Sequence, residues 1–351
     1  MKKIVIFFFL IACLYFIFVN KKDTKINISS KNKLSLKTEN KKITRRTSIF
    51  IPYWALGQGD YMNSSYDAYY YFGITVDQNG VIKTEPGYTG LAQFNCPKTK
   101  KCYLVIRMLD NEINKKILTD VNMQKLIIQQ SLDIADTYSF TGIALDLELS
   151  GIFNDEVTKQ INSFVQSYYT SAKKNYKMFS FIVYGDNYYR KRPFDIKFIG
   201  TVSDEIMIMA YDFHKSYGEP GPNFSFNEKD KYNYDFMQMI SDFSADISSE
   251  KLSVIFGMYG YDWTLNAQGL PLKRREAVTV NQMRQFPKSN SQLPITNFQD
   301  TISKEKKIEY IDAKNFKHVI YYEDEGSAAI KSEYLLKQGI GSTSYWAYGY
   351  F

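Results

Sequence analysis

The amino-acid sequence predicts a parallel (β/α)8 TIM barrel with an incomplete ring of outer helices and an insertion after its seventh strand. Apolar runs with strand character alternate with helix-like segments along the chain, as in parallel α/β folds. Residues 47–351 also form one block of a size at which α/β barrels occur as single domains. The strand near 141–148 ends in two acidic residues, which suggests a barrel mouth that performs acid/base chemistry.

The expected elements follow from apolar runs of strand length and from longer segments with helical periodicity. Strands are expected near residues 48–54, 68–76, 103–109, 141–148, 179–184, 205–213, 252–259 and 342–348. Helices are expected near residues 122–137, 155–174, 232–243 and 328–337. The first two crossovers are short and rich in glycine, so the helix ring should be incomplete there. Residues 264–318 are too long and too polar for an ordinary loop and predict the insertion.

The N-terminus carries sixteen consecutive apolar residues, Ile4–Val19, between lysines on either side. This run is slightly long for the core of a cleaved signal peptide and slightly short for a membrane span. We expect residues 1–20 to form an uncleaved signal-anchor, with lipoprotein processing at Cys13 and ordinary cleavage as the alternatives. All three would export the folded part, and the first would hold it outside the cytoplasm at the cell membrane.

Residues 21–46 are expected to form a disordered basic linker, because they hold ten Lys/Arg, two acidic residues and little apolar area. The linker carries +8 and Lys2 and Lys3 add two charges, so a chain of net charge +7 leaves −3 for the barrel. The linker would act as a solvated spacer or would adhere to anionic lipid or wall polymer. An exported, mildly acidic domain argues against nucleic acid as a partner, and we expect a monomer.

The segment Thr141–Glu148 is the most informative part of the chain. Side chains two apart on a strand share a face, so Asp146 and Glu148 lie on one face with Gly142 and Ala144, while the alternate residues are aliphatic. The two acidic residues are separated by about 7 Å along the backbone. Each would disfavour ionisation of the other, which can keep a Glu protonated as a general acid. The alternative is a solvated strand end.

The cysteines predict a small covalent loop. Cys96 and Cys102 flank five residues without a metal-ligand pattern, and the two histidines, His214 and His318, are far away in the sequence. In an oxidising compartment such a pair is expected to form a disulfide. We expect no metal and no cofactor.

Several motifs in order indicate a family. Thr141–Glu148 reads T-G-I-A-L-D-L-E and resembles the fourth-strand signature D-G-x-D-x-D-x-E of glycoside hydrolase family 18, the chitinase-like family. Residues 205–214 resemble its sixth strand, M-x-Y-D, and residues 252–263 its seventh, which ends in G-x-x-x-Y-G. Residues 338–349 resemble the last strand, and residues 320–324, I-Y-Y-E-D, resemble the spore-germination and cortex-lytic branch. The resemblance covers residues 48–350.

This resemblance implies an N-acetylglucosamine-containing glycan as substrate and a substrate-assisted retaining mechanism, in which the 2-acetamido oxygen attacks the anomeric carbon. Glu148 would be the general acid and base, Asp146 would stabilise the oxazolinium, and Tyr211 would hold the acetamide carbonyl. The other expected substrate-binding residues are Asp212, Met209, Trp346, Tyr53 and Trp54. The family also often carries a small α+β insertion after strand seven, which matches residues 264–318.

The chain departs from the family pattern at several places. The first two Asp positions of the fourth-strand signature are Thr141 and Ala144, and Val105–Met108 replaces the third-strand S-x-G-G. Without an acid at position 144, Asp146 loses a like-charge contact and should ionise more readily than in the family. Peptidoglycan or a cortex-like polymer is preferred over chitin as substrate. A catalytically inactive glycan-binding protein on the same barrel remains the alternative function.

Overall fold

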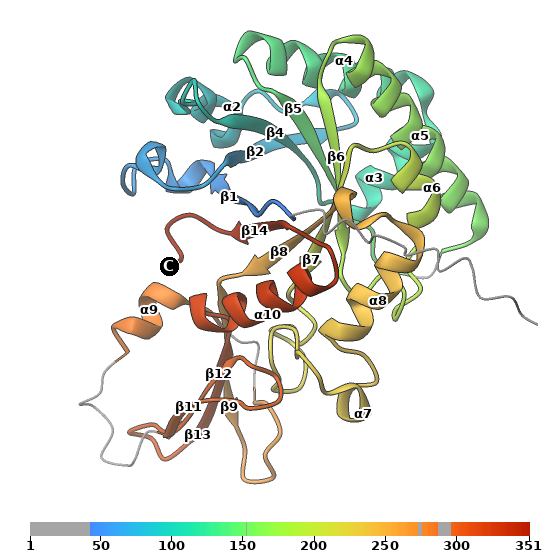
Figure 1. Cartoon of the computed structure of the whole chain (residues 1–351). Coiled ribbons are helices and arrows are strands. Elements are labelled where there is room, and N and C mark those ends of the chain that lie inside the picture. The colour runs from blue at the N-terminus through green and yellow to red at the C-terminus, as the bar shows by residue number, and fades with distance from the viewer. Residues whose placement is uncertain (1–42, 152, 273–275, 287–295) are drawn as a thin grey trace, which may run out of the picture. The chain divides into compact units, whose positions relative to one another are not determined.

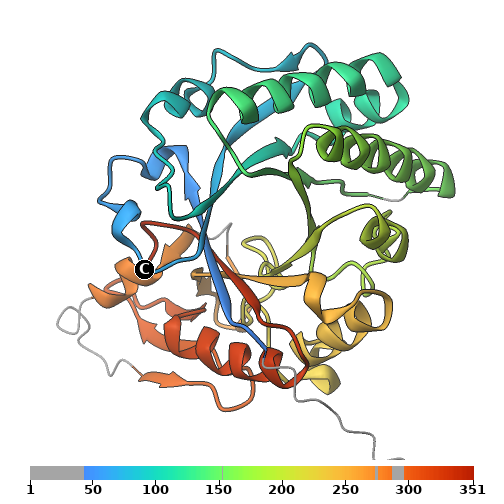
Figure 2. The same cartoon turned by 45° about the horizontal axis from the view of Figure 1, so that its top comes forward.

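Eight parallel strands close into a barrel in the computed structural model, which describes residues 43–351 apart from 152, 273–275 and 287–295 (Figure 2). The strand order is β1-β14-β8-β7-β6-β5-β4-β2, and pairing of β1 with β2 completes the ring. This confirms the predicted TIM barrel. The expected signal-anchor at 1–20 and most of the linker at 21–46 lie outside the described residues. Within the described ranges, no helix is long and apolar enough to cross a membrane.

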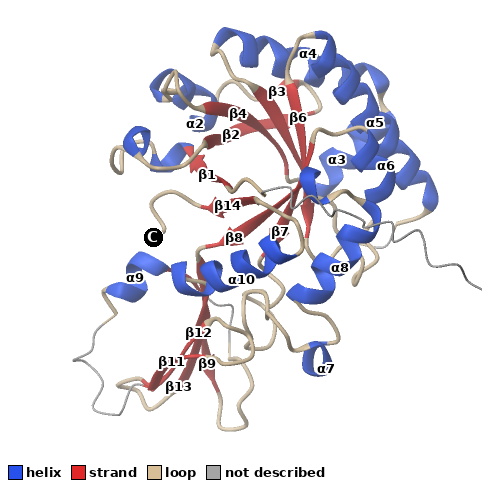
Figure 3. Cartoon of the chain, in the orientation of Figure 1, coloured by secondary structure: helices blue, strands red, loops and turns tan. Residues whose placement is uncertain are grey.

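The secondary structure alternates between strands and helices (Figures 1 and 3). The strands are β1 (Arg46–Pro52), β2 (Ala68–Asp77), β3 (Gly80–Val81), β4 (Lys101–Met108), β5 (Gly142–Leu147), β6 (Met178–Tyr184), β7 (Glu205–Ala210), β8 (Leu252–Gly257), β9 (Tyr259–Leu265), β10 (Glu276–Thr279), β11 (Thr296–Gln299), β12 (Lys306–Ile311), β13 (Lys317–Tyr322) and β14 (Ser342–Trp346). The α-helices are α2 (Pro86–Thr89), α3 (Asn111–Thr119), α4 (Val121–Thr137), α5 (Asp155–Lys174), α6 (Ile196–Thr201), α7 (Lys229–Tyr232), α8 (Phe236–Asp246), α9 (Val280–Arg284) and α10 (Glu325–Lys337).

The helix ring is incomplete at the first two crossovers, as predicted. The β1–β2 connection holds two short 3₁₀ helices, η1 (Tyr53–Ala55) and η2 (Tyr61–Asn63). The next connection holds β3, α2 and the 3₁₀ helix η3 (Gly90–Gln93). The longer helices begin with α3 and flank the remaining strands (Figure 2). These short connections leave the barrel mouth near β1 and β2 less covered by helices.

Helix α5 shows how local sequence sets an element. Its N-cap Asn154 accepts a hydrogen bond from the backbone N–H of Val157, and acidic residues occupy its first turn and lysines its last. This arrangement satisfies a free N–H group and complements the helix dipole, so the observed bounds equal the predicted ones. The prediction for residues 232–243 was less accurate. Asn233 takes a left-handed conformation (φ 62°) that ends α7, and α8 begins afresh after its cap Asp235.

The barrel wall has two apolar faces. Alternate residues of β5, such as Ile143 and Leu145, are fully buried against the outer helices in the main core. The other face fills the barrel interior with a second cluster that includes Ala144, Phe50 and Tyr70. Large rings stack there, with the centroids of Phe50 and Tyr70 5.1 Å apart. The interior is therefore packed below its mouth, and a second polar group lies at the lower strand ends, where Glu205 accepts from Tyr70 and Ser180.

The insertion is larger than predicted. It is a five-stranded antiparallel sheet of order β10-β9-β13-β12-β11 together with α9, so it spans 259–322 and not 264–318. Only Met258 separates β8 from β9. The strand pattern of the sequence continues through this residue, which explains why the change of sheet was not predicted. Figure 1 shows this small α+β layer below the barrel strands, beside α10.

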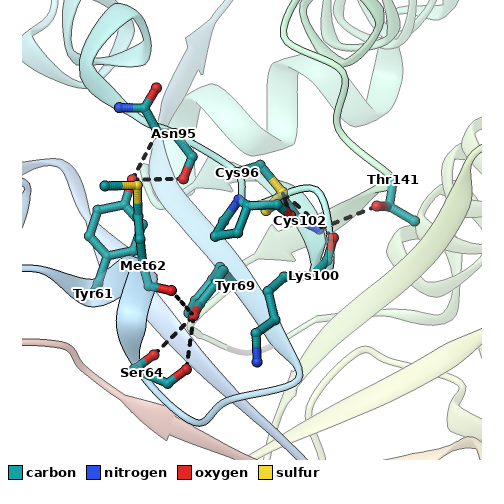
Figure 4. The surroundings of a disulfide bond; sticks show 10 residues. Tyr61, Met62, Ser64, Tyr69, Asn95, Cys96, Lys100, Cys102 and Thr141 are labelled. Atoms are coloured by element: carbon teal, nitrogen blue, oxygen red, sulfur yellow. Dashed lines mark hydrogen bonds between the residues drawn. A yellow bond between two sulfur atoms is a disulfide. The ribbon is translucent and has the colours of Figure 1, made fainter.

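A disulfide joins Cys96 to Cys102 at the start of β4, with Cα atoms 6.1 Å apart (Figure 4). The backbone N–H of Cys102 donates to the Thr141 hydroxyl at 3.2 Å, just before β5. Thr141 therefore helps to pair two strands at their N-terminal ends. Because barrel enzymes act at the opposite ends of their strands, the disulfide has a structural position.

Candidate active site

Two carboxylates lie at the C-terminal end of β5. Strand pairing places Asp146 beside Arg107 of β4 and Ile182 of β6, and Glu148 follows the strand directly. Asp146 is only 4% exposed, and its Oδ1 has no hydrogen-bond partner among the residues that the structure describes. A buried carboxylate oxygen without a donor is costly when charged. The side chain therefore favours its protonated form until a ligand supplies a partner.

Electrostatics agree with this description of Asp146. Burial raises the pKa of Asp146 well above its ordinary value, the charge of Glu148 raises this pKa further, and Arg107 opposes both effects. Sequence reasoning expected the effect of Glu148 and, because position 144 lacks an acid, easier ionisation than in the family. Burial is the largest cause and could not be read from the strand pattern. Burial and the charge of Glu148 therefore both oppose ionisation of Asp146.

Tyr184, at the end of β6, is a site residue that the sequence analysis missed. Its hydroxyl donates to Glu148 Oε2 at 2.7 Å, and the guanidinium carbon of Arg192 lies 3.6 Å from its ring centroid. Burial and the nearby Glu148 raise the pKa of Tyr184, so it remains a hydrogen-bond donor. The available signal was its place at the C-terminal end of the strand after β5. This residue fixes the orientation of the Glu148 carboxylate.

Tyr211 and Asp212 come directly after β7. Burial raises the pKa of Tyr211, and the charges of Asp146 and Glu148 raise it further, so its hydroxyl stays protonated close to both acids. Asp212 has a left-handed backbone (φ 58°), and its Oδ1 accepts from the hydroxyls of Tyr259 and Tyr261. Asp212 is thus held by tyrosines of the insertion.

A cavity of about 210 Å³ brings these predicted residues together. Asp146, Glu148, Tyr211, Asp212, Met209 and Trp346 all line it. Trp346 is half-buried and packs edge-on against Phe72, with ring centroids 4.4 Å apart. The cavity therefore combines an aromatic surface, paired carboxylates and a phenol donor, a set that suits a polar ring with an apolar face.

Tyr53 and Trp54 are placed differently. Neither lines this cavity. Trp54 is 42% exposed and its ring centroid lies 6.3 Å from that of Trp346, while Tyr53 packs edge-on against Trp54 at 4.9 Å. They form an aromatic rim beside the mouth and support Trp346 from outside. Across the described ranges, no group of three or more His, Cys, Asp or Glu could hold a metal ion.

Comparisons with known proteins agree with this geometry. The chain is 27% identical over 250 residues to the "Uncharacterized glycosylase YvbX" of Bacillus subtilis, covering 68% of this chain and 66% of that protein. It is 25% identical over 294 residues to the "Cortical fragment-lytic enzyme" of Bacillus anthracis, covering 80% and 64%. The chain therefore spans just under two thirds of the length of these curated relatives.

A solved structure shares the fold. The spore cortex-lytic enzyme SleL of Bacillus cereus superposes with a TM-score of 0.67 at 19% identity, covering 88% of this chain and 72% of that one. The curated relatives confirm the resemblance to the spore cortex-lytic branch, and this structure shows the shared fold. Residues 76–350, most of the chain, match the family profile "Glycosyl hydrolases family 18". The chain belongs to this family of glycosyl hydrolases.

Proposed function

We propose that this protein hydrolyses glycans that contain N-acetylglucosamine, by a retaining mechanism in which the substrate's acetamide is the nucleophile. The observation that carries the proposal is the pair Asp146 and Glu148 in one cavity, with Asp146 buried and its Oδ1 without a partner among the described residues, and with the Tyr211 hydroxyl nearby. A protein that only binds sugars has no need of a proton donor in this position. Trp346 offers an aromatic surface to the sugar ring.

The mechanism uses the proton that the pair shares. When the substrate binds, its acetamide N–H supplies the partner that Asp146 Oδ1 lacks, so Asp146 can ionise and the proton passes to Glu148. Glu148 then donates this proton to the leaving oxygen as the acetamide oxygen bonds to the anomeric carbon. Ionised Asp146 stabilises the cationic oxazolinium, and the Tyr211 hydroxyl donates to the former carbonyl oxygen. Glu148 finally removes a proton from the water that opens the ring.

The test is turnover by the full chain of chitin oligomers and of purified peptidoglycan, with products identified by mass spectrometry. We expect reducing ends at N-acetylglucosamine and faster cleavage of peptidoglycan, because the curated relatives include a cortical fragment-lytic enzyme. A matched glycan without acetyl groups should not be cleaved, since it lacks the nucleophile. Equal cleavage of the deacetylated glycan would exclude acetamide assistance, and binding without cleavage would identify a glycan-binding protein.

The N-terminal segment supports a location for this activity. Sixteen apolar residues between lysines partition into a bilayer, so we propose that residues 1–20 hold the enzyme at the outer face of the cell membrane, close to the cell's own wall. The full chain should then appear in the membrane fraction with an intact N-terminus. A lipid-modified Cys13 would indicate lipoprotein processing, and a secreted form starting after residue 20 would contradict the tether.

A further inference from the structure

A second groove, of about 550 Å³, adjoins the active-site cavity. The two share Arg192 and Lys215 in their linings, so the groove continues from the side of the cavity where Tyr184 contacts Glu148. It is built from the segments that follow β6 and β7. A glycan chain seated in the cavity could therefore extend into it without a change in the fold.

Cationic side chains dominate this groove. Its lining includes Arg190, Arg192, Lys215 and Lys231 but only one acidic residue, Glu219. Both arginines are neutralised in part by the single carboxylate behind them, that of Asp186. Lys231 lies 3.2 Å from Glu228.

Lys215 differs from these three cations. Its Nζ lies 5.9 Å from the ring centroid of Tyr184, and it makes no ion pair with a carboxylate in the described part of the chain. Its charge is therefore available to a ligand.

The groove also carries exposed aromatic rings. Tyr217 is 78% exposed and Tyr189 is 41% exposed, and both line it. Exposed tyrosines beside the Lys215 ammonium provide a stacking surface for a sugar and a partner for an anion. The adjoining cavity is more acidic, because its lining combines the carboxylates of Asp146, Glu148, Asp186 and Asp212 with the two cations that it shares with the groove, Arg192 and Lys215. An anionic substituent is therefore favoured in the groove over the cavity.

The geometry points to a subsite for a sugar that carries a carboxylate, placed next to the sugar at Trp346, with Lys215 as the main determinant of specificity. N-acetylmuramic acid has such a carboxylate on its lactyl ether, and a wall peptide attached to that group brings carboxylates of its own. This inference rests on the proposed function, since the cavity must hold an N-acetylglucosamine residue for its neighbour to reach the groove. A preference for a sugar with a carboxylate would distinguish the protein from enzymes that act on chitin, which is uncharged.

Binding measurements can test the subsite apart from catalysis. Full-length Glu148→Gln protein is titrated by calorimetry with a tetrasaccharide of alternating N-acetylglucosamine and N-acetylmuramic acid, with its methyl ester, and with the peptide-bearing form. We expect the free acid to bind about tenfold more tightly than the ester, a typical effect of a charge-assisted hydrogen bond. The preference should weaken at about 1 M salt, where the screening length is about 3 Å. The peptide-bearing arm shows whether the lactyl group or the peptide supplies the anion.

A second substitution assigns the effect to the groove. Adding Lys215→Gln should bring the acid-to-ester ratio close to one, whereas adding Lys174→Gln, exposed at the far end of α5, should leave it unchanged. Equal binding of acid and ester by the parent protein would overturn the subsite, even if both are hydrolysed by the enzyme with Glu148 intact. A retained preference without any hydrolysis by that enzyme would support the subsite and contradict the proposed function.

Discussion

Burial raises a carboxyl pKa in two clusters of charged side chains among the described residues. One is the pair Asp146 and Glu148 at the barrel mouth. The other is a triad between α10 and the insertion, in which the Lys331 ammonium contacts Glu305 and Glu323 and all three side chains are fully buried. The pair opens onto a cavity, whereas the triad is closed on every side by protein.

The triad is compensated internally. Lys331 Nζ donates to both carboxylates and to the backbone carbonyl of Phe224, and Glu305 accepts from the backbone N–H groups of Asn223 and Phe224. Burial raises the pKa of Glu323 to about 8, so near neutral pH its carboxyl is largely protonated and adds little charge beside the contact of Lys331 with Glu305. Burial of a carboxyl thus helps to hold the fold together in the triad of Lys331, Glu305 and Glu323, which we call the pin. In the pair of Asp146 and Glu148, burial instead favours a proton that can be transferred. Access to a cavity and the lack of a buried ammonium distinguish the pair from the triad, although Glu323 Oε1, like Asp146 Oδ1, has no hydrogen-bond partner among the described residues.

The pin also bears on the active site. Glu305 holds Asn223, whose side-chain oxygen accepts from the backbone N–H of Asp212 at 2.8 Å. Asn223 also donates to the carbonyls of Gly257 and Tyr259, where the barrel passes into the insertion. The triad therefore fixes the loop after β7 from behind. We expect its loss to be felt mainly as lost stability.

The largest expected effect concerns the open pair. Glu148→Gln should reduce turnover by about 10²–10⁴-fold, because a general acid contributes this much and the amide cannot donate an equivalent proton. The free energy of unfolding should change little, since Glu148 lies at the edge of a cavity. Kinetics and denaturant unfolding check both statements. Glu112→Gln on the exposed surface of α3 is the control, and a Glu148 variant as active as the parent would remove this residue from the mechanism.

The reverse outcome is expected for the closed triad. Lys331→Met removes the only ammonium that contacts Glu305 and Glu323 in the described structure and should lower the free energy of unfolding by about 3–5 kcal/mol. Lys115→Met, which breaks an exposed pair with Glu112, should cost less than about 1 kcal/mol. Urea titrations measure both. If the two variants lose the same free energy of unfolding, the triad does not stabilise the fold more than an exposed ion pair does.

The sequence predicted the two regions unequally. Apolar runs of strand length identified all eight barrel strands, and the spacing of Asp146 and Glu148 indicated a site because both lie on one strand. The triad was invisible, since Glu305 and Lys331 are far apart in the chain and charged side chains are normally exposed. Tyr184 was missed for a related reason, because only the alignment of neighbouring strand ends brings it to Glu148. Strands and the spacing of residues within them could be predicted from the sequence, whereas side-chain contacts between different elements could not.

The pH dependence of stability sharpens the comparison. The folded state raises the pKa of Glu323 from 4.5 to about 8, so its stabilising contribution is complete below about 4.5 and is lost as pH rises through 8. In that window the free energy of unfolding should fall by up to roughly 1.4 kcal/mol per pH unit from this group. Glu323→Gln keeps the neutral form and should flatten this slope. Glu333→Gln, exposed on α10, should retain it, and equal slopes for parent and Glu323→Gln would contradict the assignment.

The smallest expected effect separates positioning from catalysis at the open pair. Tyr184→Phe removes the 2.7 Å hydrogen bond to Glu148 but keeps the ring that Arg192 covers, so kcat should fall by about tenfold with little change in KM. Tyr188→Phe is a matched control, because Tyr188 donates at the same 2.7 Å distance to Asp246, away from the cavity. Turnover at saturating substrate compares the two variants. A similar kcat loss in both would mean that Tyr184 acts only through general stability. A loss confined to Tyr184→Phe would show that Tyr184 orients the Glu148 carboxylate without compensating its charge. In the triad, by contrast, Lys331 compensates the charge of the carboxylates that it contacts.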